Sequence, residues 1–472
     1  MTQTTPPAAG GAAAPATPGA TPGATPAAAA PAAVGFGHAL RFWLKLGFIS
    51  FGGPAGQIAI MHTELVERRR WISEKRFLHA LNYCMLLPGP EAQQLATYIG
   101  WLMHRSWGGI VAGALFVLPS LFILIALSWV YLRFGDVPAV AGIFFGLKPA
   151  VTALVLHAAH RIGTRVLKNR WMWGISAASF LAIFAFNLPF PAIVLAAGLA
   201  GHLGARRWPE VFVLGGAHGS VKQGYGPALI DDDTPTPAHA RFSRSRLAKV
   251  LGIGIGLWAL ATVALVSAYG VQGTFTQMGW FFTKAALLTF GGAYAVLPYV
   301  YQGAVETHQW LSGPQMIDGL ALGETTPGPL IMVVAFVGFV GGWLQQVLGP
   351  DALFLGGAAA ATVVTFFTFL PSFVFILAGG PLVEATHGKL GFTAPLSAIT
   401  AAVVGVILNL ALFFAYHVLW PQGLHGRFDV LSGAIAAAAA VALFRYKLGV
   451  MPLLGACAVL GLASSWLLPL FR

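Results

Sequence analysis

The chain has 472 residues, of which 57% are hydrophobic and 9% are charged, and its formal net charge at pH 7 is +12. Soluble globular proteins carry roughly 25% charged residues, so this composition excludes a water-soluble fold and predicts a membrane protein. In that setting the excess of Lys and Arg marks cytoplasmic loops and gives no support to nucleic-acid binding.

Residues 1–37 contain no charged side chain and consist largely of Ala, Pro, Thr and Gly, which predicts a disordered tail and no signal peptide. About thirteen apolar segments follow, most of them long enough to cross a hydrocarbon core of roughly 30 Å. They span residues 38–60, 77–103, 108–133, 140–160, 171–187, 189–204, 248–268, 278–300, 315–344, 352–380, 395–419, 428–445 and 448–469. The fold class we predict is an all-α polytopic membrane protein.

A polar, proline-bearing stretch at 205–246 divides these segments into two groups. Its arginines predict a basic cytoplasmic linker. We therefore predict a first repeat at 38–204 and a second at 247–472, which carries one extra span at its N-terminal end.

The two halves are related in sequence. Shifting the first half by 239 positions aligns thirteen identical residues between 42 and 90 without a gap. The residues of the first half are Phe42, Lys45, Phe51, Gly52, Gly53, Val66, Glu67, Trp71, Ser73, Leu81, Pro88, Gly89 and Pro90. After an insertion, Leu118-Pro119-Ser120 also matches Leu370-Pro371-Ser372. These blocks predict an internal repeat.

The orientation of the repeats follows from the number of crossings between them. About seven predicted segments separate the two starts, and an odd number inverts the second copy, as in many secondary transporters. An N-terminus inside the cell places the basic stretches 161–170, 205–249 and 445–447 in the cytoplasm, but it places Arg68, Arg69 and Arg70 outside. Either segment 77–103 is re-entrant, or those arginines have a role there.

Glycine pairs interrupt one apolar segment in each half. Gly52-Gly53 and Gly291-Gly292 follow Ser50 and Thr289, and Pro54 follows the first pair. Unwound backbone inside a membrane is tolerated where it lines a cavity, so freed N–H groups there would suit an anion. Lys45 and Lys284 precede the pairs by two helical turns and are candidates to supply positive charge. The alternative is a packing kink with lysines that reach the membrane surface.

A Pro-Gly-Pro triplet follows in each half, as Pro88-Gly89-Pro90 and Pro327-Gly328-Pro329. Proline ends the preceding helix and suits the first position of the next. Each new helix start would present unpaired N–H groups to an oxyanion. Gln93 and Thr326 lie beside the triplets and can donate further hydrogen bonds.

Three carboxylates lie in otherwise apolar segments: Glu91, Asp318 and Glu324. Ionisable residues inside a membrane are functional candidates, and a buried carboxyl group can carry a proton that couples transport to the proton gradient. Pairing with Arg or Lys for structural reasons is the alternative.

The stretch from Glu64 to Arg76 is basic, and Arg68 is a candidate oxyanion ligand because the guanidinium group forms paired hydrogen bonds. An interfacial amphipathic helix anchored by Trp71 explains the same pattern. The second half has Thr307, His308 and Gln309 in place of the three arginines, so contacts with a substrate need not be symmetric.

Enzyme motifs are missing from the sequence. There is no phosphate-binding G-x-x-x-x-G-K-[ST] loop, no H-E-x-x-H and no G-x-S-x-G. Cys84 and Cys457 lie far apart in apolar segments, which excludes a Cys-x-x-Cys metal site. We therefore expect no cofactor, no metal and no enzymatic activity.

The motifs Phe51-Gly52-Gly53-Pro54, Glu67-Arg68-Arg69-Arg70-Trp71-Ile72 and Leu87-Pro88-Gly89-Pro90 resemble those of the chromate ion transporter family, in its long two-domain form. The second half is similar through Phe290-Gly291-Gly292 and Thr326-Pro327-Gly328-Pro329, so the resemblance covers about 38 to 469. It implies a multi-pass protein of the bacterial inner membrane that exports chromate and gives chromate resistance, with its two domains oppositely oriented.

Several alternatives remain open at this stage. A carrier of sulfate or another oxyanion belongs to the same class, while an anion channel or a membrane enzyme belongs to a different one. The expected partners are chromate, sulfate as a second candidate substrate, protons as the candidate coupling ion, and membrane lipid, with no nucleic acid. The sequence leaves the oligomeric state open, a homodimer included.

Overall fold

The computed structural model describes residues 31–208, 225–290, 292–386 and 393–467. Within these ranges the chain is helical, and the one pairing of extended segments is an isolated parallel bridge between Ile72 and Ile230. The predicted all-α class is therefore confirmed for the part of the chain that is described. Most of the predicted N-terminal tail lies outside these ranges.

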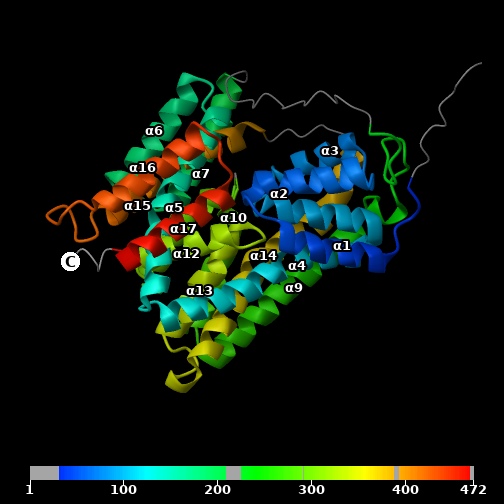
Figure 1. The fold of residues 1–472 in the computed structure, drawn as a ribbon. Coiled ribbons are helices and arrows are strands. Elements are labelled where there is room, and N and C mark those ends of the chain that lie inside the picture. The colour runs from blue at the N-terminus through cyan, green and yellow to red at the C-terminus, as the bar shows by residue number, and fades with distance from the viewer. Residues whose placement is uncertain (1–30, 209–224, 291, 387–392, 468–472) are drawn as a thin grey trace, which may run out of the picture.

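The first half begins with several short helices, which are followed by longer ones. Its elements are α1 (Phe36–Ile49), α2 (Gly53–His62), the π-helical turn η1 (Thr63–Arg68), α3 (Glu74–Cys84), α4 (Glu91–Phe134), α5 (Pro138–Val166), α6 (Arg170–Phe184) and α7 (Phe190–Arg207). Figure 1 shows α1, α2 and α3 at one end of the molecule and α6 at the other.

The second half repeats this order after the linker and one additional helix. Its elements are η2 (Ala238–Ala240), α9 (Arg244–Tyr269), α10 (Thr274–Leu288), α11 (Ala293–Tyr301), the π-helical turn η3 (Gln302–Thr307), α12 (Gly313–Thr325), η4 (Leu330–Met332), α13 (Val333–Leu344), η5 (Pro350–Ala352), α14 (Leu353–Thr386), α15 (Thr393–Leu419), α16 (Val430–Phe444) and α17 (Val450–Leu467).

Local geometry recurs at the shift of 239 positions. The π-helical turns η1 and η3 occupy equivalent residues, and each ends before a residue of left-handed backbone, Arg70 and Gln309, both with φ of 51°. Equivalent serines then cap the next helix, because Ser73 accepts from the N–H of Arg76 and Ser312 accepts from that of Gln315. The two halves thus share backbone conformation as well as sequence.

Helices α1 and α2 form a hairpin that returns to the end where it started. Arg69, just after η1, stacks over the ring of Phe42 in α1 with 4.8 Å to the ring centroid. Its guanidinium also lies 3.4 Å from the ring nitrogen of His38. At 1.5 Å per residue, the 14 residues of α1 span about 21 Å before the chain turns back into α2.

Helix α3 and the first part of α4 (91–103) form a second hairpin. Non-helical backbone at His104 and Arg105 separates this part from the second part of α4 (106–134). The two parts run antiparallel, since a Cβ atom on Gly100 would lie 2.5 Å from the carbonyl of Gly108, and one on Gly113 would lie 2.2 Å from the hydroxyl of Thr97. Glycine is needed at these close approaches.

The second half forms the equivalent hairpins. In the first, Phe281 of α10 lies 5.6 Å from the ring of Trp310, which follows η3. In the second, a Cβ atom on Gly341 near the end of α13 would lie 3.0 Å from Trp310 as well. The ends of both hairpins opposite their turns, called the open ends below, therefore lie together at Trp310.

The linker packs on the open ends of the first-half hairpins. The N–H of Ser73 donates to the carbonyl of Ile230 (2.9 Å), and its hydroxyl donates to Asp232 (2.6 Å). His239 contacts the carbonyl of Trp101 at 2.9 Å, at the end of the first part of α4. Both ends of the α3–α4 hairpin therefore lie on the same side of the molecule as the linker.

Five helices of the described residues are long and apolar enough to cross a membrane by length and composition, namely α4, α5, α9, α14 and α15. Shorter apolar helices cover Leu330–Leu344, Val430–Phe444 and Val450–Trp466. Four predicted segments, 38–60, 77–103, 278–300 and 315–344, contain paired or broken helices. The breaks lie at the Gly-Gly and Pro-Gly-Pro motifs for which broken helices were predicted, although each segment was counted as one crossing. The reason is local, because each contains a glycine in left-handed backbone, which in two of them lies between prolines, and proline cannot continue the preceding helix.

Candidate functional site

The turns of the hairpins, called the tips below, lie at Gly52-Gly53 and Pro88-Gly89-Pro90 in the first half and at Gly292 and Pro327-Gly328-Pro329 in the second. They meet across the two halves through reciprocal backbone hydrogen bonds. The N–H of Gly328, in the second Pro-Gly-Pro triplet, donates to the carbonyl of Ser50 in the first half (2.8 Å). The N–H of Gly89, in the first triplet, donates to the carbonyl of Thr289 in the second half (2.8 Å). The two bonds join equivalent residues, so each half completes the broken helix of the other.

The glycines at these tips adopt backbone that side chains rarely allow. Gly52 and Gly53 have φ of 86° and 69°, Gly292 has 95°, and the triplet glycines Gly89 and Gly328 have 123° and 102°. Glycine populates this region without steric cost, which is why it occurs where the chain turns. Gly291, the other predicted glycine, lies outside the described residues.

A small cavity lies between the tips, at the starts of four helical segments. Pro54 and Gln57 line it from α2, and Pro90 and Glu91 from α4. From the second half come Ala293 at the start of α11 and the run Pro329-Leu330 that leads into α13. The first N–H groups of a helix lack partners and carry partial positive charge. Two helix starts from each half therefore surround one point, which favours an anion.

Side-chain amides around the tips retain unused polar atoms. The amide nitrogen of Gln57 donates to the carbonyl of Gly328 and to that of Ser50 at 3.4 Å, while its oxygen has no partner among the described residues. The amide oxygens of Gln93 and Gln94 and the hydroxyl of Ser120 are likewise buried without a partner there. Because an unpaired buried polar group costs about 1–3 kcal/mol, these atoms indicate a place for water or another hydrogen-bond donor, since the three amide oxygens can only accept.

Serines of the second repeated block lie against the triplets of the opposite half. A Cβ atom on Gly89 would lie 2.4 Å from the hydroxyl of Ser372, and one on Gly328 would lie 2.8 Å from the Cβ atom of Ser120. These two serines are equivalent in the repeat, so a second reciprocal pair of contacts joins the halves.

The predicted hydroxyl residues are buried at the tips but donate to their own helices. Ser50 donates to the carbonyl of Leu46, and Thr289 donates to the equivalent Ala285, both at 2.7 Å. Thr326 donates to the carbonyl of Gly323 at 3.1 Å. The backbone carbonyls of Ser50 and Thr289, rather than their hydroxyls, join the two halves.

Three predicted cationic residues are not brought to the tips. Lys45 and Lys284 are exposed on α1 and α10, and the ammonium of Lys284 lies 5.7 Å from the ring centroid of Trp280. Arg68 is 69% exposed and pairs with Glu64 at 2.7 Å. The lysines lie on the outer faces because the buried faces of their helices carry Phe42, Trp43, Phe281 and Phe282.

The three predicted carboxylates have different surroundings. Glu91 begins α4 and lines the cavity. Glu324 is buried near the end of α12 and accepts a short hydrogen bond from the hydroxyl of Tyr294 at the start of α11. Asp318 pairs with Lys148 of α5 at 3.3 Å, and it also accepts from the hydroxyl of Tyr131 in α4 at 2.9 Å.

Sequence reasoning missed four residues of this region as site candidates: Gln57, Tyr131, Lys148 and Tyr294. Gln57 and Lys148 carried a signal, since each is a polar residue inside an apolar segment. The tyrosines carried none, because an aromatic residue in an apolar segment is ordinary.

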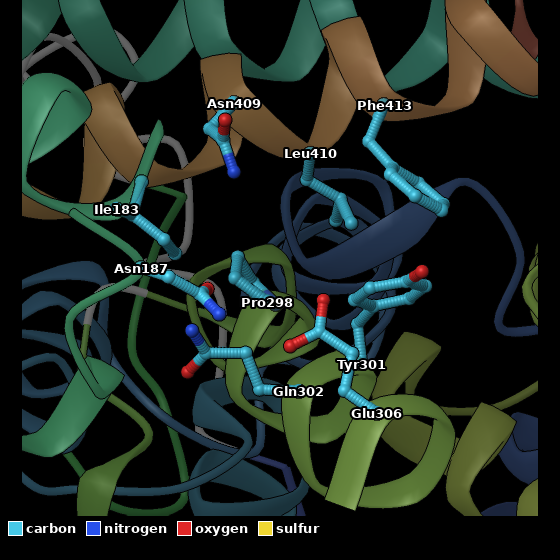
Figure 2. A pocket seen from close by; sticks show the side chains of 9 residues that line it. All are labelled: Ile183, Asn187, Pro298, Tyr301, Gln302, Glu306, Asn409, Leu410 and Phe413. Carbon is cyan, nitrogen blue, oxygen red and sulfur yellow. The ribbon is translucent and has the colours of Figure 1, made fainter. Parts of the chain in front are cut away.

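A second cavity of about 50 Å³ lies at the open end of the α10–α11 hairpin. Figure 2 shows the side chains of Asn187, Gln302 and Glu306 grouped on one side of it, with Asn409 of α15 opposite. Gln302 already binds the N–H of Phe190 at 3.1 Å. This cavity is lined by none of the predicted site residues, so we treat it as separate from the tips.

Comparison with known proteins agrees with the repeated motifs. A sequence model for the family described as chromate transporter matches residues 38–202 and 276–462. A chromate transport protein of Pseudomonas aeruginosa is 34% identical over 80% of this chain and 80% of its own length. A chromate transport protein of Cupriavidus metallidurans is 29% identical over 80% of this chain and 82% of its own length. A probable chromate transport protein of Synechococcus elongatus is 27% identical over 84% of this chain and 87% of its own length. No solved structure matches the chain.

Proposed function

The chain belongs to the chromate transporter family, and from this premise we propose that it is a secondary transporter that exports chromate across the bacterial inner membrane and so gives chromate resistance. A multi-pass membrane protein follows from the family and from the apolar helices, and relatives named as transport proteins favour a transporter over an enzyme.

The cavity between the hairpin tips is the observation that carries this proposal. It lies where the two repeats meet, and helix starts from both repeats surround it. Its volume of about 10 Å³ is room for about one water molecule, so the tips would have to separate to admit chromate. Chromate is an oxyanion with two negative charges, and backbone N–H groups at helix starts bind such anions without a buried cation. We propose that the tips at Gly52, Gly53, Gly89, Gly292 and Gly328, with Gln57 and Gln93, form the binding site.

We further propose that the repeats are inverted, with four re-entrant hairpins. The crossings would be the second part of α4 together with α5, α6, α7, α9, α14, α15, α16 and α17. Five of them, the second part of α4 and α5, α6, α7 and α9, separate α1 from α10, and this odd number inverts the second repeat. The arrangement also places Arg68, Arg69 and Arg70 on the side of the basic linker, which removes the conflict with the positive-inside rule.

Labelling of single cysteines tests this topology. Arg68→Cys and Thr307→Cys replace equivalent exposed residues of the two repeats, and Asp233→Cys lies in the linker. We expect a membrane-impermeant thiol reagent to label the first and third from the cytoplasmic side and the second from the opposite side. The parent chain is the control, since Cys84 and Cys457 are buried. Labelling of Arg68→Cys and Thr307→Cys from one side would exclude inverted repeats.

Glu91 and Glu324 are our candidates for proton coupling, because both lie at the tips. The test is uptake of radiolabelled chromate by everted membrane vesicles, which load substrate that cells would export. We expect uptake to be at least about tenfold above vesicles without the protein, to be abolished by an uncoupler, and to be affected little by excess sulfate.

Other outcomes of this experiment point to the alternatives. Complete competition by sulfate would identify a carrier of sulfate or oxyanions in general. Flux that is indifferent to the uncoupler would identify an anion channel or an uncoupled carrier. A change in the oxidation state of chromium by the purified protein would identify a membrane enzyme.

A further inference from the structure

The two repeats differ in how far their first hairpins are covered by other helices. Every residue of α11 is buried, whereas in the equivalent helix α2 only Gln57 and Met61 are. Helix α15 covers α11, and Tyr301 stacks on Phe413 there with 4.4 Å between the ring centroids, as Figure 2 shows. The hairpin of the second repeat is thus closed over, while much of α2 is left uncovered.

The helix that covers α11 has an equivalent in the first repeat. Shifting α5 by 248 positions onto α15 aligns four identical residues within six positions, namely Ala150, Thr152, Ala153 and Val155 with Ala398, Thr400, Ala401 and Val403. At the same shift Arg161 and Arg165 are equivalent to Asn409 and Phe413, both of which line the cavity of Figure 2. Two arginines of α5 therefore take the positions that in α15 face α11.

These two arginines are unpaired cations on one face of α5. They continue the face that carries buried Leu147, Leu154 and Ala158 earlier in the helix. Arg161 is half-buried and Arg165 is exposed, and within the described part of the chain neither guanidinium forms a hydrogen bond or an ion pair. Because like charges one helical turn apart repel each other, this pair would be stabilised by an anion.

Both arginines act on the carboxylates at the tips. Arg161 interacts electrostatically with Glu324 and Tyr294, and Arg165 interacts with Glu91, which lines the cavity between the tips. Ionised carboxylates there would repel an arriving oxyanion. The arginines offset that charge, so the electrostatic barrier on the way to the tips is lowered.

The arginines lie on the side from which an exported anion arrives. Helix α5 ends at Val166, and in the proposed topology this end lies in the cytoplasm with the basic linker. At 1.5 Å per residue, Arg161 lies about 7 Å from that end along the helix axis. An anion that comes from the cytoplasm along this face of α5 meets Arg165 first and Arg161 next.

From these observations we propose that Arg161 and Arg165 form an entry site, where the exported oxyanion binds before it reaches the cavity between the tips. The inference rests on the proposed function, because it takes the ligand to be a tetrahedral dianion. The guanidinium groups donate paired hydrogen bonds to oxygens of the anion. They hold it until the tips separate, since the cavity as it stands is too small for it. Asn409 and Phe413 carry no charge, so the second repeat has no equivalent entry site.

Uptake of radiolabelled chromate by everted vesicles tests the proposal, because the cytoplasmic face of the protein lies on their outer surface. Arg161→Gln combined with Arg165→Gln is expected to raise KM about tenfold and to leave the maximal rate within about twofold of the parent value. The matched control is Arg206→Gln combined with Arg207→Gln, which removes two exposed charges from the end of α7 on the same side. We expect this control to keep the parent KM.

The salt dependence of KM distinguishes binding of the anion from a structural role. Salt screens the attraction between exposed charges, so the parent KM should rise severalfold between about 50 and 500 mM salt. In the double glutamine variant it should change little. Arg161→Lys combined with Arg165→Lys keeps both charges but not the paired hydrogen bonds, and it should keep the salt dependence.

The outcomes separate this inference from the proposed function. If the parent takes up chromate and the double glutamine variant keeps the parent KM, the entry site is overturned and the cavity site stands. An equal rise of KM in the control would overturn it too, because the effect would then belong to surface charge in general. If the parent takes up no chromate, the proposed function is overturned and the entry site with it.

The single variants decide the matter should the double glutamine variant fail to reach the membrane. Arg161→Gln and Arg165→Gln are each expected to raise KM about threefold. An unchanged KM in both would overturn the proposal.

Discussion

Gly328→Ala is expected to abolish chromate uptake by everted vesicles, with a loss of at least about 100-fold. Two effects combine at this residue. Its φ of 102° is strained for any residue with a Cβ atom, at a cost of about 1–3 kcal/mol. The added Cβ atom would also lie 2.8 Å from that of Ser120, which belongs to the opposite repeat.

The strain would act on the contact that joins the repeats. The N–H of Gly328 donates to Ser50, and its carbonyl accepts from Gln57, so a shift of this residue breaks these two of the bonds between the halves. Gly89→Ala should have the same effect, since its Cβ atom would lie 2.4 Å from the hydroxyl of Ser372. Equal losses for the two variants are expected if the tips act as a pair.

Suitable controls are glycines of the same chain with free space around them. A Cβ atom on Gly174 or Gly252 would meet nothing within 4 Å, so alanine at either position should leave uptake unchanged. The amount of each variant in the membrane is measured in parallel, which separates loss of transport from loss of protein. Normal uptake by Gly328→Ala would mean that the tips do not form the site.

Glu324→Gln is expected to remove uptake driven by the proton gradient, by at least about tenfold, while exchange of chromate across the membrane continues. An amide has nearly the shape of a carboxyl group but cannot carry a proton. Glu324 is buried, and its partner Tyr294 lies beside Ala293, which lines the cavity. A proton bound there would be close to the anion.

Two measurements on the same vesicles distinguish coupling from binding. Uptake against a gradient reports coupling, and exchange of labelled for unlabelled chromate reports binding and movement alone. Glu306→Gln is the matched control, because this glutamate is exposed and lies outside the tips. If Glu324→Gln loses exchange as well as driven uptake, Glu324 supports the structure of the site and does not carry the coupling proton.

The sequence by itself determined the features that depend on local chemistry. Composition determined the membrane environment, because few charged residues are available to face water. Proline and glycine determined where helices break, because Pro88 and Pro327 cannot continue a helix and Gly89 and Gly328 allow the left-handed turn. Two copies of these motifs were enough to predict a repeat and a broken-helix site.

The tertiary structure decided which of these groups meet, because helix packing determines which face of a helix is buried. On α1 and α10 the aromatic residues take the buried face, so Lys45 and Lys284 point outward, although their spacing from the glycines suggested a shared face. On α5 the buried side leaves Lys148 beside Asp318, a residue 170 positions away in the chain. Contacts between residues so distant follow from packing and carry no local signal.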